Sequence, residues 1–198
     1  MLKEDNVRRG FVEDGEFSRL AAEAHELWLR TFLELAFTYG RRRGELLGLR
    51  VRQVKLTART IRLDVETTKN REGREVAMTP KLESLLRKAI AGKGAADHVF
   101  TRRNDKLVVD FRDAWQHLCE RAGLGEFVCN ACHQIASGGR KCVECRSTKT
   151  TYRGLIVHDL RRSSPKALRA AGVPESVIMD AGGWRLRDVS SVRDPQLC

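Results

Sequence analysis

Long apolar runs and tyrosines are scarce in this sequence of 198 residues. No apolar run approaches the roughly 18 residues that a membrane-spanning helix requires. The first ten residues, MLKEDNVRRG, contain no apolar segment of the kind found in a secretory signal. These absences predict a cytoplasmic protein that does not interact with a membrane. The sequence contains just two tyrosines, Tyr39 and Tyr152, so few phenol groups are available for chemistry.

Acidic residues are also too few to balance the basic ones. The 37 Lys and Arg residues exceed the 26 Asp and Glu residues, which gives a formal net charge of +11 at pH 7. Nucleic acid is the commonest partner of so basic a chain, because Lys and Arg neutralise backbone phosphates. Acidic substrates and a merely solvated basic surface are alternatives that charge alone does not exclude. The length permits one buried core, so a single domain with a small insertion is expected.

Four of the six cysteines form the pattern C-x2-C-x9-C-x2-C, at Cys129, Cys132, Cys142 and Cys145. In a cytosolic chain disulfides are disfavoured, and paired C-x2-C turns are typical of zinc sites. Four thiolates complete a tetrahedral zinc site and leave no open position, so the metal is expected to be structural. Two disulfides or unpaired thiols are the disfavoured alternatives, and His133, directly beside Cys132, is poorly placed as a fourth ligand. We therefore predict an inserted zinc ribbon over residues 126–150, folded largely by its metal.

Most of the chain carries the three- and four-residue spacing of apolar side chains that is typical of helices. Gly40 follows the first helical run at a position suited to a C-terminal cap, and Pro80 suits the first turn of another helix. Helices are expected over 15–39, from about Arg43 to Leu49, and over 80–91, 109–122, 155–171 and 175–181.

One region changes to the alternating pattern of a half-buried strand. Residues 59–66 alternate apolar and polar side chains. The polar segment 67–73 is predicted to be a turn that displays Lys69, and 74–78 is predicted to return as a second strand. Residues 51–56 would add a third. The predicted fold class is therefore α+β, mainly helical, with a small antiparallel sheet.

Side chains suited to phosphate binding recur in a set order. Arg42 precedes Glu45 by three residues, so on one helical face the carboxylate can orient the guanidinium. His158 precedes Arg161 by three residues, so both can reach one phosphate. Arginine forks make bidentate contacts to phosphate oxygens, and two of them can stabilise a pentacoordinate transition state. Most isolated arginines are solvated and most single histidines are structural, so the prediction depends on the ordered set.

This ordered set resembles the tyrosine recombinase (phage integrase) family. The family's catalytic domain carries an Arg-x-x-Glu-Leu box, a lysine on a β-hairpin, a His-x-x-Arg box, a Gly-His or Gly-Trp pair, and lastly a tyrosine. The corresponding segments here are Tyr39–Leu49, Thr67–Lys69 with Arg74–Pro80, Val157–Arg162 with Ala171–Pro174, and Gly182–Trp184. The resemblance covers about residues 15–187, apart from the cysteine-rich insertion.

By this resemblance, the chain would be a DNA-binding integrase or site-specific recombinase domain that cleaves and joins DNA strands. Arg42 and Arg161 would bind the scissile phosphate, and Trp184 would donate its indole N–H to a phosphate oxygen. His158 would assist proton transfer, and Lys69 would protonate the leaving 5′ oxygen. The family's nucleophile is a tyrosine, which attacks phosphorus without a metal. The implied partner is double-stranded DNA, on which the chain could self-associate.

The sequence departs from the family pattern in three respects. The tyrosine is expected near Arg193, and neither of the two tyrosines lies in that segment. No N-terminal core-binding domain is recognised before the catalytic region, so residues 1–198 are predicted to form one integrase-like catalytic domain. Pro165 lies where the family continues a helix, and because proline is tolerated only in a first turn, this helix is expected to begin late, at Ser164.

Two interpretations of function remain. The first is a truncated integrase domain from a mobile element, which keeps the phosphate site and lacks the tyrosine nucleophile. The alternative is a non-catalytic DNA-binding or regulatory module that uses the zinc ribbon and the basic surface. A longer reading frame with a tyrosine would favour the enzyme, and a natural stop after Cys198 would favour the binding module.

Overall fold

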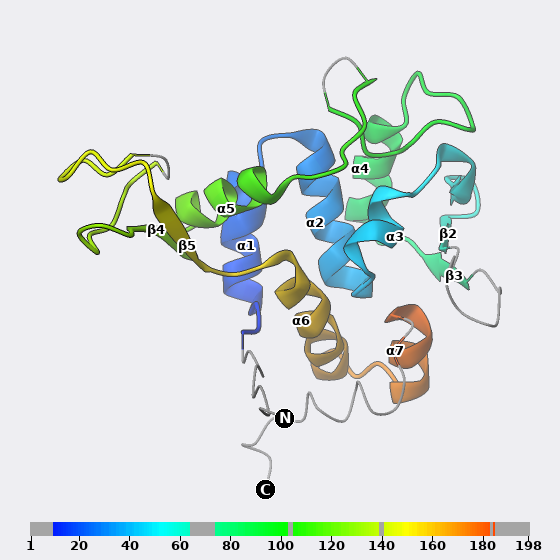
Figure 1. Ribbon diagram of the computed structural model, residues 1–198. Helices are drawn as coiled ribbons and strands as arrows, with labels where there is room; N and C mark the ends of the chain where they lie inside the picture. The colour runs from blue at the N-terminus through cyan, green and yellow to red at the C-terminus, as the bar shows by residue number, and fades with distance from the viewer. Residues whose placement is uncertain (1–9, 64–73, 103–104, 139–140, 183, 185–198) are drawn as a thin grey trace, which may run out of the picture.

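The computed structural model describes residues 10–63, 74–102, 105–138, 141–182 and 184. The expected lysine hairpin with Lys69 and the tail after Trp184 lie outside these residues. None of the described helices is long and apolar enough to cross a lipid bilayer. In chain order (Figure 1) the elements are α1 (Asp14–Glu23), α2 (Leu27–Tyr39), α3 (Arg43–Leu47), η1 (Val51–Gln53), β1 (Val54–Lys55), β2 (Thr60–Leu63), β3 (Arg74–Ala77), α4 (Pro80–Ala89), α5 (Arg112–Arg121), β4 (Gly125–Cys129), β5 (Thr150–Gly154), α6 (Val157–Ala170) and α7 (Glu175–Gly182).

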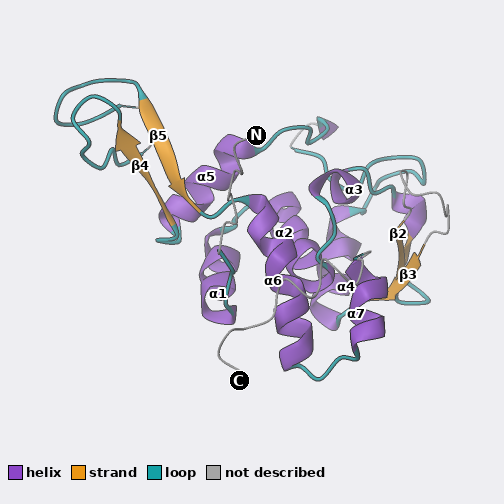
Figure 2. Cartoon of the chain, turned by 60° about the horizontal axis from the view of Figure 1, so that its bottom comes forward, coloured by secondary structure: helices purple, strands orange, loops and turns teal. Residues whose placement is uncertain are grey.

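Helix α2 forms the centre of the molecule. Its sequence, LWLRTFLELAFTY, is apolar around most of its circumference, and helices α1, α4 and α6 pack around it (Figures 1 and 2). A helix that is apolar on nearly all sides is stable only when it is buried. Phe32 is fully buried and meets Phe100 and Phe111 edge to face, with ring centroids 6.0 and 4.8 Å away. This cluster fixes α2 against the segment that leads into α5.

The end of α2 sets the position of Arg42. Gly40 caps the helix in the left-handed conformation, with φ of 57°, and its N–H donates to the carbonyl of Ala36 at 3.0 Å. Glycine adopts this conformation without a steric penalty, and the predicted cap is confirmed. Helix α3 begins three residues later, at Arg43, and the Glu45 carboxylate accepts the backbone N–H of the preceding Arg42 at 3.3 Å. The chain therefore turns sharply at the residues that carry the first predicted arginine.

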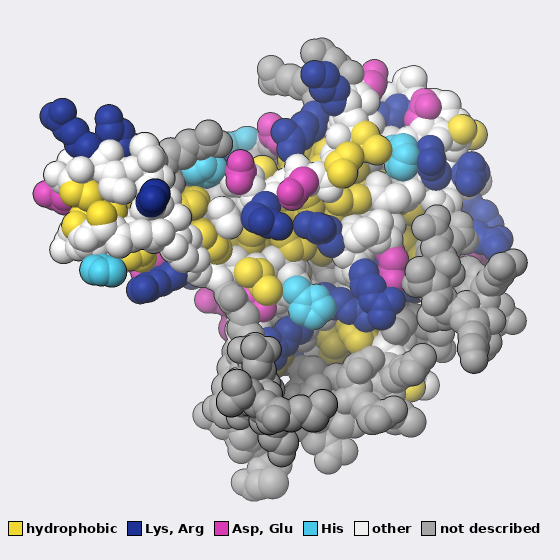
Figure 3. All heavy atoms as spheres, viewed as in Figure 1, with side chains coloured by type: hydrophobic (Ala, Val, Ile, Leu, Met, Phe, Trp, Pro, Cys, Tyr) yellow, Lys and Arg dark blue, Asp and Glu magenta, His cyan; other side chains and the backbone are white. Residues whose placement is uncertain are grey.

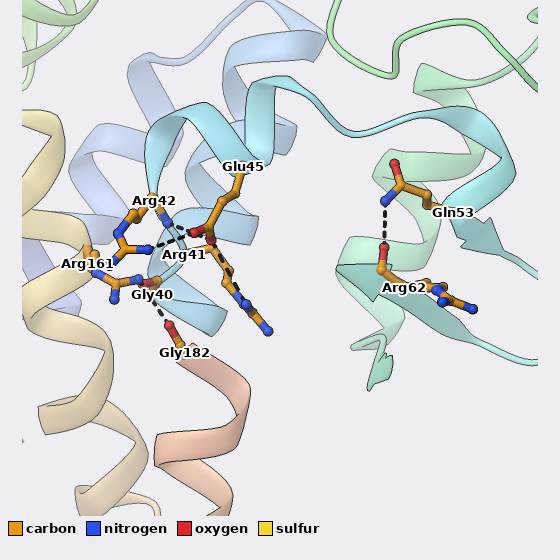
Figure 4. Close-up of polar contacts among 8 residues, drawn as sticks. All are labelled: Gly40, Arg41, Arg42, Glu45, Gln53, Arg62, Arg161 and Gly182. Atoms are coloured by element: carbon orange, nitrogen blue, oxygen red, sulfur yellow. Dashed lines mark hydrogen bonds and ion pairs between the residues drawn. The ribbon is translucent and has the colours of Figure 1, made fainter. Parts of the chain in front are cut away.

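The predicted antiparallel sheet is confirmed in the order β1-β2-β3. Val54 pairs with Ile61, and Ile61 pairs with Val76, so one face of the sheet buries its apolar side chains. Gln53 joins η1 to this sheet, because its side-chain amide donates to the Arg62 carbonyl at 3.0 Å (Figure 4). The strands are shorter than predicted among the described residues.

A second sheet was not predicted. Strands β4 and β5 pair antiparallel, with Phe127 opposite Tyr152, and they flank the cysteine-rich segment. We refer to residues 125–138 and 141–154 as the cysteine module. It projects from one side of the molecule beyond α5 (Figures 1 and 2). The cysteine-rich segment therefore lies between two paired strands that connect it to the helical body.

Helix α6 passes through Pro165 without a break, so the prediction that it begins at Ser164 is wrong. Proline removes one backbone donor from a helix interior. Contacts with other segments of the chain hold α6 in position. The Ser164 hydroxyl donates to the carbonyl of Thr38 on α2 at 3.1 Å. The Ser163 hydroxyl accepts the Val12 backbone N–H at 2.6 Å, and within the helix it donates to the Asp159 carbonyl at 2.7 Å. Because the helix starts at Val157, it carries the whole His-x-x-Arg box.

Candidate functional site

A cavity of about 350 Å³ lies among α2, α3, α5 and α6. The polar side chains that line it are mainly arginines, with one histidine. The rest of the lining is mainly aromatic and aliphatic. The basic residues that line it are Arg41, Arg42, Arg43, Arg112, His158 and Arg161. We call this space the arginine cavity. Several guanidinium groups around one small space favour an anion, since each would otherwise repel the others.

Glu45 lies between two of these arginines. Its carboxylate is 3.3 Å from Nη1 of Arg42 and 3.9 Å from Nη1 of Arg41 (Figure 4). The Arg42 side chain is 57% exposed, so its guanidinium is also open to solvent. Glu45 thus restricts the orientation of the Arg42 side chain. The remaining N–H donors of Arg42 stay accessible to solvent.

Arg161 is buried and joins three segments of the chain. Its Nη1 donates to the carbonyl of Gly40, and to the carbonyl of Gly182 at 3.1 Å (Figure 4). The guanidinium carbon lies 5.1 Å from the centroid of the Trp184 ring, within the range of a cation–π contact. The cation is therefore held in one position before any ligand arrives, and holding it there requires both α2 and α7.

The Trp184 indole occupies space that two glycines leave open. A Cβ atom at Gly40 would lie 2.3 Å from the ring, and one at Gly182 would lie 1.9 Å from it. Trp184 packs behind Arg161 and is absent from the lining of the arginine cavity. The sequence placed Trp184 in the same motif as Gly182, but it gave no signal that Gly40 makes room for the ring.

His158 lines the cavity with a lowered pKa. Partial burial is the largest cause, and the positive charges of Arg161, Arg162 and Arg42 add to it, while Asp159 opposes them. Because the pKa falls below the ordinary value of about 6.5, the neutral form of the imidazole predominates at pH 7. A neutral imidazole can accept a proton on one nitrogen and donate from the other.

Sequence reasoning missed three basic residues of this cavity, Arg41, Arg43 and Arg112. Arg112 begins α5, and Arg43 stands 3.9 Å from Asp110, which precedes that helix. An isolated arginine at the start of a helix gives no sequence signal, because most such residues are solvated. Lys69, predicted to complete the set, lies outside the described residues.

Neither tyrosine offers its hydroxyl to the cavity. Tyr39 is buried and donates to the Ala77 carbonyl, and burial, followed by the charge of Glu34, raises its pKa to about 12. Tyr152 lines the cavity with its ring, but its hydroxyl donates to the Leu155 carbonyl at 3.0 Å. Both phenols are therefore structural in this arrangement.

The four cysteines of the repeated pattern form one cluster. Their sulfur atoms all lie within 4.8 Å of one another. Distances of 3.4 Å from Cys129 to Cys145 and 3.5 Å from Cys132 to Cys142 join the two C-x2-C turns. A zinc ion bound at about 2.3 Å by four tetrahedral thiolates separates its sulfurs by roughly 3.8 Å. The spacing and chemistry of the donor set fit such an ion.

Backbone amides stabilise one of these sulfurs as a thiolate. The N–H groups of Cys132 and Ala131 lower the pKa of Cys129 to about 6, and the Ala131 N–H donates to its sulfur at 3.4 Å. His133 is exposed, adopts a φ of 61°, and does not belong to the cluster.

The sequence of this chain matches a protein family and a known protein. The model described as "Phage integrase family" matches residues 11–137. The integrase of Salmonella phage P22 is 24% identical over 190 residues, which cover 90% of this chain and 42% of that protein. The chain thus spans less than half the length of this relative.

Two solved structures illustrate the similarity of fold. The Tn1549 transposon integrase in complex with transposon right end DNA has a TM-score of 0.67 at 16% identity, covering 98% of this chain and 64% of that one. A lambda integrase tetramer bound to a Holliday junction has a TM-score of 0.64 at 16% identity, covering 98% of this chain and 51% of that one.

Nearby positive charges help to lower the pKa of His158, so we predict that this pKa changes when the charge in the cavity changes. Replacing Arg42 with Gln removes a nearby positive charge, so the pKa of His158 is expected to rise toward its ordinary value. Inorganic phosphate bound in the cavity should raise it as well. NMR titration of the imidazole resonances measures both shifts. Lys88→Gln, on α4, is the matched control and should leave the titration unchanged. A His158 titration insensitive to both Arg42→Gln and phosphate would contradict this account.

Proposed function

The chain belongs to the phage integrase family, and we propose that it binds duplex DNA and holds one phosphodiester in the arginine cavity. The observation that supports this proposal is the convergence of Arg42, His158 and Arg161 on one small space. Arg42 precedes α3, whereas His158 and Arg161 lie on α6, more than a hundred residues later, so their meeting is a product of the fold. A phosphate there would relieve the repulsion among the cations.

Each residue of the site has a proposed role. Arg42 and Arg161 would bind the non-bridging oxygens of the scissile phosphate, where charge increases in the transition state. Neutral His158 would accept and return a proton at the same phosphate. Lys69, outside the described residues, would protonate the leaving 5′ oxygen. Trp184 was predicted to donate its indole N–H to the phosphate, and its packing behind Arg161 supports at least a second role, in holding that guanidinium.

Strand cleavage needs an attacking oxygen in line with the 5′ O–P bond. As the new O–P bond forms, the 5′ oxygen leaves and takes up a proton. The two tyrosines of this sequence both donate their hydroxyls to main-chain carbonyls. We therefore propose that these 198 residues hold the phosphate without cutting it. This observation also favours the alternative function, in which the chain is a non-catalytic DNA-binding or regulatory module.

A structural zinc ion is proposed for the cysteine module. The four thiolates of Cys129, Cys132, Cys142 and Cys145 would hold it and leave no position for a reacting group. The apolar cluster of the module is small, consisting of Phe127, Ala136 and the neighbouring cysteines. A metal would therefore supply much of the stability of the module, whereas the proposed chemistry at the phosphate uses no metal.

DNA binding is the first test of the proposal. Affinity for duplex DNA is expected to fall steeply with salt, because bound phosphates release counterions. Arg42→Ala should weaken binding by about tenfold or more, the effect of losing one charged hydrogen bond. Arg42 is exposed enough for the variant to fold, and Lys88→Ala is the control of equal charge. Fluorescence anisotropy at several salt concentrations measures both. Equal affinities for the Arg42→Ala variant and the control would count against the site.

Covalent chemistry gives a second test. The 198-residue chain is expected to form no covalent adduct with a nicked suicide DNA substrate, whose cleaved strand cannot religate. The Tyr39→Phe/Tyr152→Phe double variant serves as the control, since it contains no phenol. A protease-sensitive DNA–protein band that is present with the wild-type chain and absent with the double variant would contradict the prediction. A band on a partner protein's tyrosine would restrict the prediction to this chain alone.

Metal content gives a third test. Elemental analysis of the purified protein should find one zinc per chain, and Cys142→Ser should remove most of it. Cys119→Ala is the matched control, because Cys119 lies in the main core and outside the cluster. Absence of zinc in the wild-type protein, or disulfides among the four cysteines, would rule out the structural metal.

A further inference from the structure

We propose that the cysteine module is a second DNA-contacting surface, which binds the duplex backbone on one side of the phosphate held in the arginine cavity. The inference rests on the proposed function and extends it to the insertion. Four features support it: the contacts of the module with α5, a groove adjacent to the cavity, the cationic side chains of the module, and the basic side chains on one face of the molecule.

The module is held firmly against α5. The Gly138 N–H donates to the Glu120 carboxylate of α5 at 2.8 Å. The His117 ring of α5 lies 5.3 Å from the ring of Phe127, which packs edge to face on Tyr152. Because α5 also supplies Arg112 to the arginine cavity, the module and the cavity share one rigid wall. A ligand that fills the cavity therefore meets the module in a defined position.

A groove of about 610 Å³ lies beside the cavity along this wall. Gln116 and Tyr152 line both spaces, so the two are adjacent. Beyond them the groove is lined by the hydroxyl-bearing residues Thr148 and Thr150 of the module. Threonine hydroxyls and amides are common donors to backbone phosphates. Asp113 is the one carboxylate in this lining and would repel phosphate, so contact is expected on the threonine side.

The module carries more cationic side chains than carboxylates, a difference that does not include the net charge of about −2 of a zinc ion held by four thiolates. Its described cations are Lys141, Arg146, Lys149 and Arg153, against the carboxylates Glu126 and Glu144. Within the described part of the chain, no ion pair engages any of these four cations. Lysine and arginine side chains without a carboxylate partner remain available to neutralise phosphates.

Basic side chains also occupy the face of the molecule that Figure 3 shows. In Figure 3, Lys and Arg side chains stand on the module at the left and also around the exposed histidine near the centre of the same face. A duplex that places one phosphate in the cavity and follows the groove would pass over both groups. The module also exposes Ile135 and Val143, at 58% and 70%, but these are two isolated side chains rather than a broad apolar surface. Charge therefore favours DNA over a second copy of the chain as the occupant.

The experiment compares two triple variants of the full chain that lose equal charge. The module variant is Lys141→Ala/Lys149→Ala/Arg153→Ala, at exposed positions. The control is Arg30→Ala/Lys88→Ala/Lys106→Ala, at exposed positions that line neither space. Duplex affinity is measured across a salt series, and zinc content and melting temperature are measured on each variant. The module variant should reduce the slope of log affinity against log salt by about 2 to 3, near 0.9 for each lost phosphate contact.

The outcomes separate this inference from the proposed function. A reduced slope for the module variant, with the wild-type slope for the control and unchanged zinc content, supports the inference. A wild-type slope for the module variant, while Arg42→Ala still weakens binding, overturns the inference and leaves the proposed function in place. Loss of self-association without a change of slope would likewise overturn it, in favour of a second copy. If the wild-type chain binds no duplex at low salt, both proposals fail.

Discussion

The site depends on the hydrogen bonds from one buried guanidinium to two main-chain carbonyls. Arg161 donates to Gly40 at the end of α2 and to Gly182 at the end of α7, so a charged side chain determines where three helices meet. A buried cation is costly unless it is hydrogen-bonded and near an opposite charge. The carbonyls stabilise it, and a phosphate bound in the arginine cavity would bring a negative charge close to it. Fold and ligand are thus expected to stabilise each other at this residue.

The cysteine module is stabilised by different interactions from those of the helical body. The helical body is held by a large apolar core around α2, whereas the module has a small cluster and four close sulfurs. A hairpin with so few apolar contacts needs a crosslink to be rigid. Its attachment to α5 joins the two units, because the same helix contacts Phe127 on one side and carries Arg112 on the other.

Local patterns in the sequence predicted the elements whose stability is local. The apolar periodicity of α2, the cap at Gly40 and the alternation in β2 were each correct. Pro165 misled the prediction, because its effect is offset by the contact of Ser164 with Thr38, more than a hundred residues away. The same limit applies to the site. Motif spacing brought out Arg42, His158 and Arg161, while Arg112 enters the cavity only because the tertiary fold brings α5 there.

The packing of Trp184 between two glycines has a consequence for how this part of the protein can change. Positions 40, 182 and 184 share one fixed volume, since either added Cβ would overlap the indole. A larger residue at one position is tolerable only with a smaller one at position 184, so the energies of such changes are non-additive. That exchange would also remove the aromatic face beneath the Arg161 guanidinium. The space that Gly40 and Gly182 leave open therefore limits which side chain at position 184 can pack against the Arg161 guanidinium.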